Sequence, residues 1–191
     1  ARTYVQKNMM NTIYFTRCGF DVTNDTYCQA YRGCASVGSS ITEAVTATAN
    51  QYLCYNGRFI DALYSSSDGG ATEDNFNVNG NNSHPYLKGV IDIYEASTDS
   101  INFMSSWTIK YSPEEIAEKL KLSSPAAEII TSLSQTGNVI KMEIVSTNGS
   151  SKTIERDSCR TALGLNSIRF YVEKDESGHF AFVGSGWGHS L

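Results

Sequence analysis

Apolar residues in this chain occur in short runs, and their spacing predicts helices first and hairpins afterwards. Residues 1–11 contain neither Gly nor Pro and predict a helix. Residues 41–50 predict a second, short helix with Ser40 or Thr42 as its N-cap. Two β-prone runs then flank an Asn-Gly pair, which is typical of a β-hairpin. These runs are residues 51–55 and 58–64.

The second half of the chain predicts strands joined by tight turns, with short helices between them. Ser112 followed by Pro113 indicates a helix start, because proline is favoured at the first helical position. Residues 126–134 and 160–165 predict two further short helices. We expect strands at the end of residues 84–95 and over residues 103–111, 139–145, 151–155, 168–174 and 179–184. Strands in hairpins, rather than in regular βαβ units, predict an α+β fold.

Length and charge exclude several classes of protein. The 191 residues suit one domain, or one domain with a modest insertion. The formal net charge is −5 and the Lys and Arg residues do not cluster, so we expect no nucleic-acid partner. No apolar run approaches the roughly 18 residues of a membrane span. Five cysteines are an odd number, so at least one thiol is unpaired within the chain or shared with a metal.

Two glycine-rich segments carry the clearest functional pattern. Residues 57–73 read GRFIDALYSSSDGGATE, and the last eight residues read GSGWGHSL. Both place small polar residues beside aromatic ones. Glycine lets the backbone approach a ligand closely, and aromatic faces accommodate sugar rings. The composition predicts binding of a hydroxyl-rich ligand.

Five blocks of the sequence resemble the SpoIID/LytB family, which comprises sporulation lytic transglycosylases and amidase enhancers. They are ARTY (1–4), DTYCQAY (25–31), residues 43–73, HPYLKGV (84–90) and GSGWGHSL (184–191). The blocks run from the first residue to the last. The resemblance therefore implies one SpoIID/LytB-like domain over residues 1–191, truncated at both ends, with an inserted subdomain at about 97–160.

The resemblance implies cleavage of peptidoglycan glycan strands between N-acetylmuramic acid (MurNAc) and N-acetylglucosamine (GlcNAc). A lytic transglycosylase uses one carboxyl group, first as acid and then as base, whereas most glycosidases need two. In the family this Glu precedes the Arg of ARTY by about ten residues. It would lie before Ala1, so we expect no catalytic residue in this chain and assign cleavage to a longer parent.

The resemblance also implies a set of substrate-binding residues in the two glycine-rich segments and the first helix. They are Arg2, Tyr64, Ser66, Ser67, Gly69, Gly70, Thr72, Trp187 and His189. Hydroxyls and free backbone N–H groups can bind sugar hydroxyls and acetamides in a shallow groove. The alternatives are an exposed helix arginine, a polar loop and a surface histidine. Asp68 and Ser190 depart from the family pattern, which has Ser and Gly there.

Cys28 and Cys34 form a tentative zinc site by resemblance to family members with cysteines in this segment. Tyr27 replaces the family's His, however, and zinc needs three or four protein ligands. A disulfide or two free thiols are the alternatives. The three remaining cysteines, Cys18, Cys54 and Cys159, are expected to be small buried residues.

The resemblance implies a glycan-binding protein of a Gram-positive bacterium, located at the cell wall, on the outer face of the membrane or in the intermembrane space of a sporulating cell. Two other classes stay open. An amidase enhancer would bind glycan and activate a partner amidase without cutting. A surface interaction module would depend instead on residues 97–160.

Overall fold

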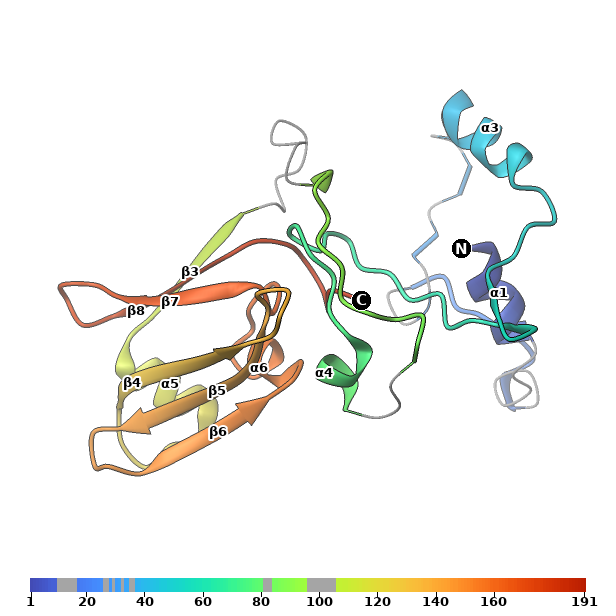
Figure 1. Cartoon of the computed structure of the whole chain (residues 1–191). Helices are drawn as coiled ribbons and strands as arrows, with labels where there is room; N and C mark the ends of the chain where they lie inside the picture. The colour runs from blue at the N-terminus through green and yellow to red at the C-terminus, as the bar shows by residue number, and fades with distance from the viewer. Residues whose placement is uncertain are drawn as a thin grey trace. The chain divides into compact units, whose positions relative to one another are not determined.

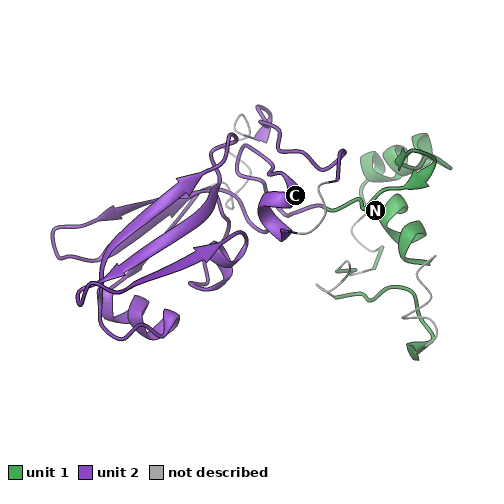
Figure 2. Cartoon of the chain, turned by 60° about the horizontal axis from the view of Figure 1, so that its bottom comes forward, with its two compact units in different colours: residues 1–63 green, residues 64–191 purple. Residues whose placement is uncertain are grey.

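The computed structural model describes residues 1–9, 17–25, 28, 30–31, 33–34, 37–80, 84–95 and 106–191. The chain divides into two compact units, which we call the N-terminal unit (1–63) and the C-terminal unit (64–191) (Figure 2). Helices and short antiparallel hairpin strands occur together, so the fold is α+β as predicted (Figure 1). None of the described helices has the length and apolar character that a membrane crossing requires.

The described part of the N-terminal unit includes two helices with defined bounds and one minimal hairpin. They are α1 (Arg2–Met9), α3 (Ser39–Ala47), β1 (Cys54–Tyr55) and β2 (Arg58–Phe59). Asn56 and Gly57 both have positive φ (48° and 73°), as a type I′ turn requires, which confirms the predicted hairpin. The predicted cap was wrong, because Ser40 and Thr42 lie inside α3 and Gly38 is its N-cap without a side-chain bond.

Polar contacts hold the described part of the N-terminal unit together. The Leu53 N–H donates to Thr3 Oγ1 at 3.0 Å, and Lys7 pairs with Asp61. Thr3 is the only residue that is buried among those described in this unit. Cys18 and Cys54 are therefore exposed, not buried as predicted, since no apolar core forms around them.

Two three-stranded antiparallel sheets and three short helices make up the regular structure of the C-terminal unit over residues 64–80, 84–95 and 106–191. The first sheet has the order β3-β8-β7, with β3 at Trp107–Tyr111, β7 at Phe170–Lys174 and β8 at Phe180–Gly184. The second has the order β4-β5-β6, with β4 at Ala126–Leu133, β5 at Val139–Ser146 and β6 at Ser151–Glu155. The helices are α4 (Asn75–Asn79), α5 (Pro113–Leu120) and α6 (Ser158–Thr161).

The hydrophobic core lies within this unit. Ile116 of α5, Met142 and Ile144 of β5, and Phe182 of β8 are fully buried, and Cys159 is buried among them as predicted. Burying one such large side chain contributes about 1.5–3 kcal/mol relative to leaving it in water.

The start of α5 follows the sequence signal closely. Ser112 Oγ accepts from the Glu115 N–H at 3.2 Å, and Glu115 Oε2 accepts from the Ser112 N–H at 2.7 Å, with Pro113 at the first helical position. This capping box satisfies two N–H groups that have no partner within the helix. The predicted helix start is confirmed.

Two predictions of secondary structure were wrong, and one helix was missed. Residues 126–133 form β4 instead of a helix, because β-branched residues such as Ile129 and Ile130 pair along β5. Residues 84–95 contain one isolated bridge, from Ile91 to Ala71, and no strand. The described chain also has a helix that was not predicted, α4, whose N-cap Asp74 accepts from the Phe76 N–H.

Candidate functional site

The structure pairs the two glycine-rich segments of the C-terminal unit. We call residues 64–72 the serine loop and residues 185–191 the C-terminal loop. Ser67 and Trp187 form an antiparallel bridge, with N–H···O distances of 2.8 Å and 3.3 Å. Ser185 Oγ donates to the Gly69 carbonyl at 2.9 Å. Segments more than 110 residues apart in the sequence thus form one continuous backbone surface.

Glycine is required where the two loops cross. A Cβ on Gly69 would lie 2.6 Å from the carbonyl carbon and oxygen of Ser185, and one on Gly186 would lie 2.8 Å from the Gly69 nitrogen. Both residues also have positive φ, 74° and 86°. Only a residue without a side chain combines that conformation with so close an approach. The glycines that suggested ligand contact therefore also serve to pack loop against loop.

A third segment, residues 90–95, lies along the other side of the serine loop. The Thr72 N–H donates to the Val90 carbonyl and the Asp92 N–H to the Gly70 carbonyl, both at 2.9 Å. Thr72 Oγ1 accepts from the Val90 N–H at 3.0 Å. The hydroxyl of Thr72 thereby stabilises the loop, and Gly70 supplies a backbone acceptor rather than a free surface.

The predicted binding residues differ in their exposure. Tyr64 and Trp187 are 43% and 44% exposed, and Ser66 is exposed as well. Ser67 is only 4% exposed, and its hydroxyl donates to Glu95. The aromatic rings and Ser66 are available to a ligand, whereas Ser67 orients a neighbouring carboxylate.

Asp68 of the serine loop forms an acidic cluster with Asp92 and Glu95 that the sequence did not predict. Their carboxylate oxygens lie within 4.8 Å of one another. Burial, together with the hydrogen bond to Glu95, raises the pKa of Asp68 to about 6. Burial also acts to raise the pKa of Glu95, but hydrogen bonds from Asp68 and Ser67 outweigh it and lower that pKa. The proton shared by this pair therefore resides on Asp68.

Glu73 occupies a buried polar site and is 2% exposed. Its carboxylate accepts hydrogen bonds from one backbone N–H and four side chains, which belong to Ser134, Thr136, Asn138 and Asn77, at 2.5–3.0 Å. Burial acts to raise the pKa of Glu73, but these donors outweigh it and lower the pKa. Its backbone N–H donates to the Ser190 carbonyl at 2.7 Å, so Glu73 ties the β4–β5 turn to the C-terminal loop.

His189 is partly buried in the C-terminal loop. Its Nδ1 accepts from the Leu191 N–H at 3.1 Å, which leaves Nε2 to carry the proton of the neutral ring. Burial lowers the pKa of His189 below its ordinary value, so the ring is neutral at pH 7. Ser190 has a φ of 59°, a conformation that is uncommon for serine and that matches the family's glycine there.

Arg2 and the two predicted zinc ligands lie in the N-terminal unit. The Arg2 guanidinium donates to the Val45 carbonyl at 2.9 Å and to Thr48, so it joins α1 to α3. Cys28 and Cys34 are not joined in a disulfide, and the Cys34 sulfur lies 3.0 Å from the Tyr31 hydroxyl. In the described ranges neither thiol belongs to a group of three metal-ligating side chains, so zinc stays a prediction.

Sequence reasoning missed Asp92 and Glu95 because they lie outside the serine loop and were assigned to a strand. A signal was available, since the HPYLKGV block leads directly into them. That block runs back along the serine loop and brings the two acids to Asp68.

Comparison with known proteins matches the two parts of the chain to different family models. The family model described as "Stage II sporulation protein" matches residues 1–55, and a domain of unknown function (DUF8618) matches residues 99–191. The amidase enhancer of Bacillus subtilis is 35% identical over 117 residues, which are 61% of this chain and 15% of that protein.

Two further relatives extend the likeness. Stage II sporulation protein D of B. subtilis is 26% identical over 151 residues, 79% of this chain and 42% of the relative. An uncharacterized protein of Brachyspira hyodysenteriae is 27% identical over 194 residues, which cover 100% of this chain and 50% of the relative. The chain thus spans half or less of each relative. The match of residues 1–55 to the sporulation-protein model, and the likeness to Stage II sporulation protein D and the amidase enhancer, support the SpoIID/LytB family for this α+β chain.

Proposed function

We propose that the C-terminal unit binds peptidoglycan glycan strands on the surface formed by the serine loop and the C-terminal loop. The pairing of Ser67 with Trp187 carries this proposal, because it joins the two glycine-rich segments into one surface. Tyr64 and Trp187 offer exposed rings for sugar faces, and Ser66 offers a hydroxyl. The family role in sporulation and cell-wall remodelling supports an extracytoplasmic setting at the cell wall.

We propose further that the whole protein cleaves the MurNAc–GlcNAc linkage as a lytic transglycosylase. The loops would hold the muramyl sugar while a carboxyl group protonates the glycosidic oxygen and then activates the C6 hydroxyl. The neutral His189 can hydrogen-bond the strand or the carboxyl group through Nε2–H. This activity predicts anhydromuramyl ends in mass spectra of digested glycan strands; hydrolysed reducing ends would contradict it.

Binding is tested with denuded glycan strands and a double variant. Tyr64→Ala with Trp187→Ala should weaken binding about a hundredfold, since each lost ring contact of about 1.4 kcal/mol corresponds to tenfold. Tyr171→Ala, which removes a 55% exposed ring from β7, is the matched control and should bind like the unaltered chain. Equal binding by all three proteins would contradict the proposal.

A second candidate is supported by the amidase-enhancer relative. In this function the chain binds glycan and stimulates a cell-wall amidase without cutting. The whole protein would then accelerate release of stem peptides from sacculi by an added amidase, with no anhydromuramyl product. The two activities are thus distinguished by their products in one digestion.

A further inference from the structure

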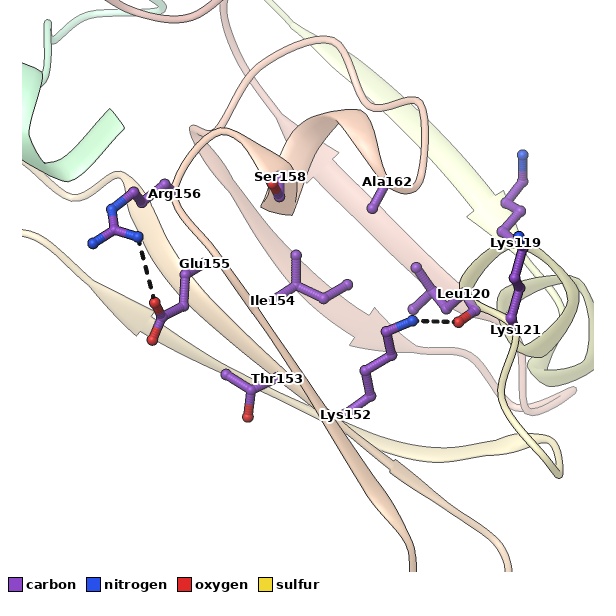
Figure 3. Close-up of a pocket in the computed structure, with 10 residues that line it drawn as sticks. All are labelled: Lys119, Leu120, Lys121, Lys152, Thr153, Ile154, Glu155, Arg156, Ser158 and Ala162. Atoms are coloured by element: carbon purple, nitrogen blue, oxygen red, sulfur yellow. Dashed lines mark hydrogen bonds and ion pairs between the residues drawn. The ribbon is translucent and has the colours of Figure 1, made fainter. Parts of the chain in front are cut away.

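The groove beside β6 in the C-terminal unit is lined by cationic side chains and by the edge of a β-sheet. Neither feature belongs to the proposed glycan site. A cavity of about 730 Å³ lies between β6, the end of α5 and α6. Its lining includes four cationic side chains and one carboxylate, although the chain as a whole has a net charge of −5 (Figure 3). The four cations are Lys119, Lys121, Lys152 and Arg156.

The strand at this groove is an edge strand. β6 pairs with β5 alone in the sheet β4-β5-β6. The ladder bonds join Ser146 to Ser150 at one end and Arg156 to Ile140 at the other, so the even-numbered residues of β6 bond to β5. The N–H and C=O groups of Ser151, Thr153 and Glu155 therefore point away from β5, and no described residue bonds to them.

The side chains around this edge divide into an apolar centre and cationic ends. Leu120, Ile154 and Ala162 occupy the centre of the groove (Figure 3). Lys152 crosses from β6 to donate to the Leu120 carbonyl at 2.6 Å. About 13 Å of strand separates residue 152 from residue 156, at about 3.3 Å per residue.

The two cationic ends are held by different means. Lys121 follows α5 in a left-handed conformation with a φ of 54°. Arg156 has a φ of 59°, and its guanidinium lies against Gly80, where an added Cβ would come within 2.5 Å of its Nε. Lys119 contributes less, because its ammonium lies over the Tyr111 ring at 4.9 Å.

We infer that this edge binds an acidic, extended peptide segment of a partner protein, which adds as a fourth strand beside β6. Backbone groups of the segment would pair with Thr153 and Glu155, as in other cases of strand addition. An apolar side chain would face Ile154, and acidic side chains two residues to either side would face Lys152 and Arg156. Inorganic polyphosphate fits less well, because its chain presents acceptor oxygens and no N–H donors for the outward-facing carbonyls at this edge.

The inference goes beyond glycan binding and is tested with the full chain and a fluorescent heptapeptide, SETVTES. The sequence of this peptide reads the same from either end, so its side chains match the groove whether it binds parallel or antiparallel to β6. SKTVTKS, in which Lys replaces both Glu residues, is the control peptide. The acidic peptide should bind and protect the amide protons of Thr153 and Glu155 from exchange; absence of that protection would overturn strand addition.

Two classes of variant separate the contributions of charge and backbone. The double variant Lys121→Gln with Lys152→Gln should weaken binding of the acidic peptide about tenfold at low salt. The control variant, Lys141→Gln with Lys174→Gln, has the same change in net charge and should bind the peptide as the unaltered chain does. Thr153→Pro removes one outward N–H and should weaken binding about fivefold, whereas Thr153→Val should not. Ser151→Pro, at the start of the strand, gives the same test if Thr153→Pro does not fold.

The outcomes distinguish this proposal from the glycan site. Each variant should retain glycan binding, because none lies in the serine loop or the C-terminal loop. If inorganic polyphosphate binds more tightly than the peptide and Thr153→Pro has no effect, the groove is a simple anion site and the inference is wrong. If the Tyr64→Ala, Trp187→Ala double variant loses glycan binding but binds the acidic peptide as before, the peptide groove is separate from the glycan site, as the inference requires.

Discussion

The two units of this chain are stabilised in different ways. In the N-terminal unit only Thr3 is buried among the described residues, and the contacts include hydrogen bonds, an ion pair and one aromatic pair, Tyr52 with Phe59. In the C-terminal unit, two sheets and two helices enclose a cluster of thirteen buried apolar residues. Apolar burial is the main favourable contribution to folding, so most of the stability of the described chain resides in the C-terminal unit.

The family resemblance is distributed differently from the stability. The sporulation-protein model matches residues 1–55, where the described chain has no apolar core. The core lies within residues 99–191, which match a domain of unknown function. The candidate site joins the serine loop to the end of this second region. The loops that resemble the family therefore depend on a core that the family pattern does not specify.

The largest expected effect tests where the stability resides. Phe182→Ala removes a fully buried ring and should lower the free energy of unfolding by about 3–5 kcal/mol. Leu53→Ala, at a residue that is 62% exposed, should change it by less than about 0.5 kcal/mol. Urea unfolding followed by tryptophan fluorescence reports on the C-terminal unit, which holds both tryptophans. Comparable effects of the two substitutions would contradict the conclusion that most of the stability resides in the core of the C-terminal unit.

The crossing of the two loops provides the next test. Gly69→Ala puts a Cβ within 2.6 Å of the Ser185 backbone at a φ of 74°, and should cost about 2–4 kcal/mol and abolish glycan binding. Gly178 has a φ of 84° but open space around it, so Gly178→Ala should cost only about 1 kcal/mol and leave binding unchanged. Equal costs measured by urea unfolding would show that the close approach is unimportant.

The sequence predicted those features that depend on local chemistry. The Asn56-Gly57 hairpin and the Ser112-Pro113 helix start are specified by two or three neighbouring residues, and both are confirmed. β4 was mistaken for a helix because its conformation depends on pairing with β5, a tertiary interaction.

The candidate site was likewise predictable only where the signal is local in the sequence. Resemblance identified both glycine-rich loops, and their pairing confirms that they are neighbours. The acidic cluster was missed, because Asp68 and Glu95 lie far apart in the sequence and meet only through the fold. Nor could the sequence show that Ser67 is buried.

Glu73 tests the polar connection between the C-terminal loop and the sheet. Glu73→Gln replaces an acceptor by an amide that presents N–H groups to side-chain donors, and should cost about 2 kcal/mol at pH 7. The pKa of Glu73 is lowered in the folded state, so its contribution is present above the pKa of the unfolded chain and is lost as the pH falls through the folded value. The stability difference between the two proteins should therefore shrink in acid; a difference independent of pH would contradict this assignment.

Asp68 should give the smallest effect, and one of opposite sign. Its folded pKa of about 6 lies above its ordinary value, so the stability that it contributes is complete in acid and is lost as the pH rises through 6. Because Asp68 is only partly buried and solvent screens its charge, we expect less than about 1 kcal/mol. Asp68→Asn removes this titration, so its melting temperature relative to the unaltered chain should increase between pH 5 and pH 8. Thermal melts of the two proteins across this range provide the measurement. Parallel curves would show that the Asp68–Glu95 pair does not share a proton.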